Sequence, residues 1–209
     1  ECISEKRLFP ELEYIFKHAL TQEIVYNGLI KSERQIIHDK IGGVIEIIFQ
    51  DRKSEFYESL SYHYERGSSK LRAVKFLIKD GEKSLGRFSL DESDQYFNRA
   101  YEIVDNLPEK TEKDYAILFE LLNRWGTVFY YRGNFGNHDK LLNKYKERVA
   151  FVSDQEIIGM FYAWCGLSAW TSGNLKDAFE SLNTAKEIGN NLKEKKVKAY
   201  ALTWLSWLC

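Results

Sequence analysis

The chain has 209 residues, of which 44% are hydrophobic and 15% aromatic, so it can bury a core and is not disordered. Its 30 basic and 31 acidic residues leave a formal net charge of -1, without the positive excess typical of proteins that bind nucleic acids or anionic membranes. No apolar run approaches the roughly 20 residues that span a bilayer. The only two prolines are Pro10 and Pro108, which favours long uninterrupted helices.

The three cysteines are Cys2, Cys165 and Cys209, and none belongs to a Cys-x-x-Cys pair. An odd number of cysteines spread this widely is not a disulfide framework. Cys165 lies in an apolar run and is predicted to be a buried structural thiol. This usage fits a reducing compartment, so we expect a cytoplasmic protein. Because the chain begins at Glu1 and not at Met, we also expect it to be a fragment.

The first 50 residues are predicted to form a helical segment. Ser32 and Gln35 have the spacing of a capping box, in which a Ser side chain accepts from an amide of the first turn and Gln reaches back. Apolar residues then recur at helical spacing and predict one wide apolar face: Ile36, Ile37, Ile41, Val44, Ile45 and Ile48.

Further start and stop signals divide the rest of the chain into helices. Capping boxes or caps mark later helix starts at Ser89, Thr111, Ser153 and Asn174. Gly133 and Gly173 are predicted to end helices, because glycine readily takes the positive φ that a helix end requires. We expect about ten helices joined by short turns, and no strands.

A pattern in the second half recurs after 40 residues. Residues 131–135 (Tyr-Arg-Gly-Asn-Phe) are echoed by residues 171–175 (Thr-Ser-Gly-Asn-Leu), and Gly126 and Gly166 each precede the Gly-Asn pair by seven residues. Such a period in a helix-rich chain indicates stacked helical hairpins. The predicted fold is all-α: a right-handed superhelical array of antiparallel helical hairpins over residues 51–209.

Small residues recur at fixed offsets inside the repeat. Gly166, Ala178 and Ala185 stand where small residues let two helices approach closely, and this spacing resembles that of the tetratricopeptide repeat. The same offsets hold small residues in two earlier units: Gly81, Ser93 and Ala100, and before them Ser61 and Ala73. The middle unit departs, because Gly126 is followed by His138 and Tyr145. Its second helix is therefore expected to pack differently.

The N-terminal part contains a second set of residues that carries a resemblance: Leu8 to Glu23, Val25, Tyr26, Leu29, Arg34, His38, Ile41 and Tyr62 to Gly67. These residues resemble a segment of bacterial STAND-type signalling ATPases that precedes tetratricopeptide repeats. The resemblance implies an upstream P-loop ATPase domain, and in many members a class III adenylate/guanylate cyclase. Neither a P-loop nor cyclase metal carboxylates occur in this sequence. We therefore expect no catalytic residues, no cofactor and no metal site.

His18 has two possible roles. The resemblance implies that it could contact the phosphates of ADP held by the absent ATPase domain and so report the nucleotide state. The alternative is an ordinary surface or capping histidine. His38, His63 and His138 lack metal-ligand spacing, and His63 is expected to pack or hydrogen-bond within its hairpin.

If the tetratricopeptide register holds, one face of the repeats forms a concave groove. Its predicted lining is Asn123, Thr127, Tyr130 and Tyr131 from one unit and Ala163, Leu167 and Trp170 from the next. Exposed aromatic rings suit a protein or peptide partner, whose binding would bias the upstream ATPase. Two alternatives stay open: later repeats or other domains of the parent chain cover these rings, or the groove binds a small effector molecule.

Residues 197–209 are predicted to form the first helix of an incomplete repeat. The apolar residues Trp204, Leu205, Trp207 and Leu208 would then be uncovered. A contiguous exposed apolar patch favours association. We expect a two-fold dimer through this helix as a consequence of truncation.

Overall fold

The computed structural model describes residues 3–7, 13–16 and 18–208, so Cys2, Cys209 and part of the segment that carries the ATPase resemblance lie outside the described residues. The chain forms two compact units, Glu1–Ala73 and Val74–Cys209, called unit 1 and unit 2 below. This division differs from the expected boundary at residue 50, and helix α4 runs through it.

Unit 1 begins with a β-hairpin followed by helices. Strands β1 (Ile3–Arg7) and β2 (Glu13–Phe16) pair antiparallel, with Ile3 opposite Phe16. Helices α1 (Ala19–Gly28), α2 (Lys31–Ile48) and α3 (Tyr57–Arg66) follow, with a 3-10 helix, η1 (Gln50–Glu55), before α3. The expectation of a helical segment over residues 1–50 is therefore wrong for the two strands.

Helix α2 is present, but its predicted start is wrong. It begins at Lys31 after Ile30, whose backbone N–H donates to the Glu33 carboxylate at 3.2 Å, so Ser32 is not the cap. Much of its apolar face stays exposed in the part of the chain that the structure describes, including Ile36, Ile37, Ile41, Val44 and Ile48.

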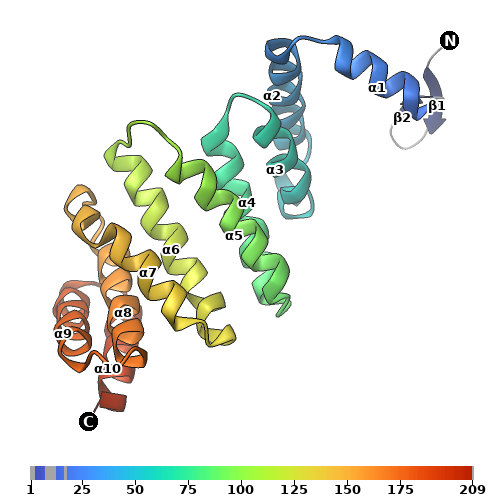
Figure 1. The fold of residues 1–209 in the computed structure, drawn as a ribbon. Coiled ribbons are helices and arrows are strands. Elements are labelled where there is room, and N and C mark those ends of the chain that lie inside the picture. The colour runs from blue at the N-terminus through green and yellow to red at the C-terminus, as the bar shows by residue number, and fades with distance from the viewer. Residues whose placement is uncertain (1–2, 8–12, 17, 209) are drawn as a thin grey trace. The chain divides into compact units, whose positions relative to one another are not determined.

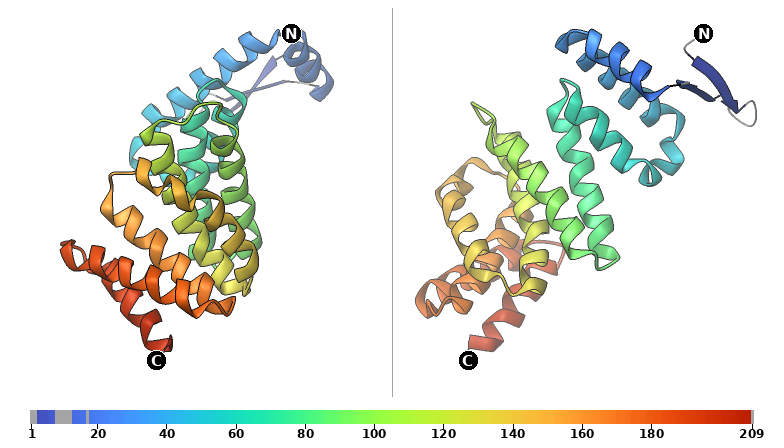
Figure 2. Two further views of the ribbon diagram at one scale, coloured as in Figure 1. Left: turned by 60° about the vertical axis from the view of Figure 1, so that its left-hand side comes forward. Right: turned by 45° about the vertical axis from the view of Figure 1, so that its right-hand side comes forward.

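Unit 2 is built of consecutive packed helices (Figure 1). They are α4 (Lys70–Gly86, which begins in unit 1), α5 (Leu90–Asp105), α6 (Glu112–Arg132), α7 (Phe135–Tyr145), η2 (Lys146–Phe151), α8 (Gln155–Thr171), α9 (Leu175–Asn191) and α10 (Lys196–Leu208). Both views in Figure 2 show the orange and red helices α8, α9 and α10 packed as one group. The described chain is thus helical apart from one β-hairpin, with sequential helix pairs as expected.

Small residues bring α8 and α9 together as predicted. A Cβ added at Gly166 would overlap the side chain of Leu182 and lie 3.2 Å from the carbonyl oxygen of Ala178. Ala178 and Ala185 are fully buried. In the earlier pair, Ser93 donates its hydroxyl to the Gly81 carbonyl at 2.8 Å, which joins α5 to α4.

The middle unit packs differently, also as expected. Helix α7 has 11 residues, and a Cβ at Gly126 would meet the Trp164 ring of α8 at 2.6 Å. Gly126 therefore admits a ring from the following hairpin. Tyr145 reaches back instead to α5, where its hydroxyl lies 3.1 Å from that of Tyr101.

Three helices end in the same hydrogen-bonded turn. After α6 and α8, the turn residues Gly133 and Gly173 have φ of 64° and 80°. After α4, the equivalent residue is Phe88, with φ of 61°. In each turn the residue after the left-handed one donates its backbone N–H to the carbonyl oxygen five residues earlier, as Ser89 does to Ser84 at 2.9 Å. This is the Schellman motif, whose left-handed position is usually glycine.

The helix starts predicted after residue 51 lie within one residue of the observed ones but differ in chemistry. Asn174 caps α9, with its side chain accepting from the Asp177 amide. Ser89 precedes α5 without a side-chain cap bond. Asp154, and not Ser153, caps α8. The Thr111 hydroxyl accepts from the Asp114 amide at 3.3 Å, while the Asp114 carboxylate accepts from the Thr111 amide at 2.8 Å.

Replacing Thr111 with Ala should lower the free energy of unfolding of unit 2 by about 1 kcal/mol, because first-turn amides of α6 lose their acceptor. Urea unfolding followed by circular dichroism measures the change. Lys113→Ala, at an exposed position in the same turn, is the control. Equal stability of the two variants would contradict a capping role for Thr111.

Candidate functional site

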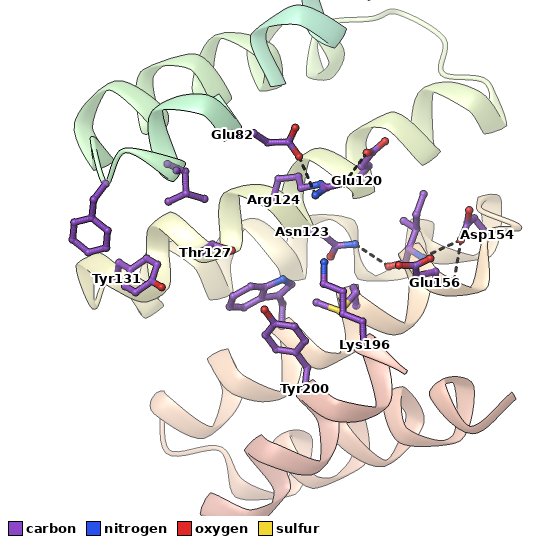
Figure 3. A pocket seen from close by; sticks show the side chains of 16 residues that line it. Glu82, Glu120, Asn123, Arg124, Thr127, Tyr131, Asp154, Glu156, Lys196 and Tyr200 are labelled. Carbon is purple, nitrogen blue, oxygen red and sulfur yellow. Dashed lines mark hydrogen bonds and ion pairs between the residues drawn. The ribbon is translucent and has the colours of Figure 1, made fainter. Parts of the chain in front are cut away.

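An open groove of about 610 Å³ lies between α4, α6, α8 and α10 in unit 2 (Figure 3). A second, smaller hollow adjoins it, and four residues line both: Thr127, Tyr131, Trp164 and Tyr200. The two hollows therefore form one continuous groove. We call the first the polar hollow and the second the aromatic hollow.

Charged side chains gather in the polar hollow. Four carboxylates and two cations line it: Glu82, Glu120, Asp154, Glu156, Arg124 and Lys196. Arg124 bridges Glu82 at 2.9 Å and Glu120 at 3.4 Å, as the dashed lines in Figure 3 show. Lys79, outside the lining, also reaches Glu82 at 3.0 Å. Within the described chain, Lys196 has no carboxylate within 4.0 Å.

Aromatic rings line the second hollow, and none of its lining residues is Asp, Glu, Lys, Arg or His. The rings are Tyr130, Tyr131, Trp164, Tyr200, Trp204 and Trp207. Trp164 and Trp204 are buried and form the floor, with ring centroids 5.0 Å apart. Tyr130, Tyr131 and Trp207 are 37%, 52% and 44% exposed. The aromatic hollow therefore offers ring surface to a ligand.

Two buried polar atoms of the groove lining have no hydrogen-bond partner in the described structure: Asn123 Oδ1 and Trp164 Nε1. The amide nitrogen of Asn123 is satisfied, since it donates to the Ile157 carbonyl at 2.9 Å. Leaving such an atom unpaired costs about 1–3 kcal/mol. Unsatisfied buried groups are rare in folded proteins, and they are one mark of sites retained for function.

Four of the seven predicted groove residues line the groove: Asn123, Thr127, Tyr130 and Tyr131. The other three, on α8, do not. Ala163 and Leu167 are fully buried, and Trp170 packs on Trp207 with centroids 5.5 Å apart. The groove side of α8 is instead formed by Glu156, Ile157, Met160 and Trp164. Helix α8 contacts α6, α7, α9 and α10, so most of its surface is covered.

Phe88 is a lining residue that sequence reasoning missed. It is 64% exposed, lines the polar hollow and meets Tyr131 edge-on at 5.1 Å between ring centroids. A left-handed conformation costs roughly 1–2 kcal/mol for a residue with a side chain. The repeat spacing in the sequence could have indicated that Phe88 occupies the same turn position as Gly133. Phe88 precedes Gly133 by 45 residues, the same spacing as Gly81 to Gly126.

None of the histidines of unit 1 is among the residues that line the groove. His18 is exposed and stands at the N-cap of α1 without a side-chain cap bond. His63 hydrogen-bonds to a residue of α2 and not within the repeat hairpin to which it was assigned: its Nδ1 lies 2.9 Å from His38 Nδ1. His38 also meets the Tyr26 hydroxyl at 2.9 Å. Burial lowers the pKa of both His38 and His63.

His138, the odd residue of the middle unit, is buried beside the groove floor. Its ring stacks on Phe129 at 4.9 Å and meets Trp164 edge-on at 5.5 Å between centroids. Nδ1 lies 3.3 Å from the Ser168 hydroxyl, and Nε2 has no partner among the described residues. Burial lowers the pKa of His138 to about 3. This histidine is a neutral core residue.

Other expectations concern chemistry and the C-terminal helix. Among the described residues, no cluster of His, Cys, Asp and Glu could hold a metal ion, and no helix is long and apolar enough to cross a membrane. Cys165 is a buried free thiol, and burial raises its pKa to about 12.

Trp204 is buried within its own chain, which leaves Trp207 as the exposed tryptophan of α10. Dimerisation through α10 stays a prediction.

Comparison with known proteins gives one informative match. The chain is 28% identical over 112 residues to an uncharacterized protein of Rhizobium meliloti (strain 1021), a match that covers 52% of this chain. The chain spans about a tenth of the length of that relative. No protein-family model matches the chain.

Proposed function

We propose that unit 2 is a non-catalytic interaction module that binds a protein or peptide segment in its groove. The observation that carries the proposal is the aromatic hollow, where Tyr130, Tyr131 and Trp207 expose ring surface beside a charged hollow. Aromatic side chains dominate the binding energy of such interfaces, and charged neighbours fix orientation and partner choice.

The resemblances support a wider proposal for the parent protein. Consecutive helix pairs with close small-residue contacts are compatible with a right-handed tetratricopeptide-like array. We infer that the chain is a cytoplasmic regulatory segment of a larger STAND-type signalling ATPase, with His18 a candidate sensor of nucleotide state in the intact protein. A partner in the groove would act by binding one state of the ATPase more tightly than the other.

Selection of random 16-residue peptides displayed on phage tests the interaction role. Peptides selected on the wild-type chain should bind Tyr131→Ala and Trp207→Ala at least tenfold more weakly, because each variant removes an exposed ring from the groove. Phe179→Ala, which removes a ring 44% exposed on α9 outside the groove, is the matched control. Fluorescence anisotropy measures the affinities. The interaction role is rejected if every selected peptide binds the groove variants as tightly as it binds the Phe179→Ala control, or if no peptide is selected.

Binding of a small effector molecule is the second candidate. It is favoured by the volume of the polar hollow, which lies in the range of about 300–1,000 Å³ usual for small-ligand sites. Native mass spectrometry of the purified chain distinguishes the two. A stoichiometric small-molecule adduct, lost in Tyr131→Ala and kept in Phe179→Ala, would favour the effector role.

A further inference from the structure

We propose that Phe88 is a ligand-contacting residue, and that the groove is built for a partner segment with a large apolar side chain and a basic side chain. The apolar side chain packs against Phe88 and Tyr131, and the basic one meets the carboxylates of the polar hollow. This proposal rests on the proposed interaction role of unit 2.

The first argument is the position of Phe88 in the fold. It occupies the left-handed residue of the turn that ends α4, where the two later turns have Gly133 and Gly173. Glycine would form this turn without steric strain. The turn itself does not require a phenylalanine, which favours another role for the side chain. Backbone strain of this kind concentrates at functional sites.

The second argument is the placement of the ring. Phe88 is 64% exposed, so it contributes little to the core. It lines the polar hollow and contacts Tyr131, which lies in both hollows. The two rings thus stand at the junction of a charged and an aromatic surface. An apolar side chain placed there would bury exposed ring surface on both of them.

The third argument is charge. The carboxylates of Glu82, Glu120, Asp154 and Glu156 still outnumber the cations at the hollow, which are Arg124 and Lys196 in the lining and Lys79 beside Glu82. A cleft with an excess of one sign attracts the opposite charge. Glu120 and Tyr131 are eleven positions apart on α6, which is about 16 Å along a helix. A 16-residue helical peptide can therefore reach both hollows.

The probes for this proposal are groove-dependent peptides, by which we mean the phage-selected peptides that bind Tyr131→Ala and Trp207→Ala more weakly than wild type. Phe88→Gly should bind them about tenfold more weakly than wild type, while its thermal unfolding midpoint stays the same or rises. Phe88→Asn is the second variant, because asparagine also tolerates the left-handed conformation. Phe179→Ala should bind the peptides as wild type does. Loss of binding with retained stability separates a ligand contact from a structural role.

The sequences of the same peptides test the charge argument. Lys and Arg should be enriched over Asp and Glu, and Glu120→Gln should weaken binding about threefold. The proposal fails if groove-dependent peptides bind Phe88→Gly unchanged, if both Phe88 variants are less stable than wild type, or if basic residues are not enriched. Each of these outcomes leaves the interaction role intact. Failure to select any groove-dependent peptide rejects the interaction role and this proposal together.

Discussion

Ala178→Leu should lower the free energy of unfolding of unit 2 by about 1–3 kcal/mol. Ala178 has no exposed surface, and its carbonyl oxygen lies in the close contact between α9 and Gly166 of α8. Three further carbon atoms have no space there, so the two helices must separate or adopt strained rotamers. Chemical unfolding followed by tryptophan fluorescence measures the loss.

The matched control is Glu180→Leu, which adds a leucine at an exposed position of the same helix. It should change stability by less than about 0.5 kcal/mol. Ala185→Leu, at the second small position of α9, should behave like Ala178→Leu because Ala185 is also fully buried. Wild-type stability in either alanine variant would show that the hairpin is not closely packed at that position.

His138→Leu should remove an acid sensitivity of unit 2. In the folded protein, burial lowers the pKa of His138 from 6.5 to about 3. The unfolded chain therefore binds a proton at a higher pH than the folded chain does. The contribution to stability is fully present above pH 6.5 and is lost as the pH falls toward 3. Between pH 6.5 and 4.5 the loss should be about 2–3 kcal/mol.

The leucine variant has no proton to bind at this position, so its stability should fall less steeply with acid. At pH 7.5 the two proteins should differ by no more than about 1.5 kcal/mol, because leucine fills a similar volume among Phe129 and Trp164. Urea unfolding at a series of pH values gives both curves. Parallel curves for the two proteins would show that His138 titrates normally in the folded state.

Sequence reasoning succeeded where a local signal has a local cause. Gly133 and Gly173 end helices because the left-handed turn residue favours glycine. Thr111 caps α6 because its hydroxyl lies within reach of amides in the next turn. The N-terminal strands were missed, and the Ser32 start failed because Ile30 and Glu33 form the cap contact instead.

The residues predicted for the groove line the two hollows on α6 but not on α8, for a physical reason. On α6 the register of the repeat assigned Asn123, Thr127 and Tyr131 to one face, and their four-residue spacing keeps them on one side of the helix. Helix α8 is apolar on nearly all sides because four helices contact it. A helix that is hydrophobic all round carries no signal of which side faces which neighbour.

The sequence by itself determined the helical hairpins, their period and the close contacts at Gly166, Ala178 and Ala185, because these depend on residues near one another in the chain. Only the tertiary structure decided that Trp164, and not Leu167, faces the groove. Helices α6 and α10 both pack on α8, and their positions determine which of its side chains stay uncovered. It also placed Phe88 beside Tyr131, a contact between residues 43 positions apart that no local pattern encodes.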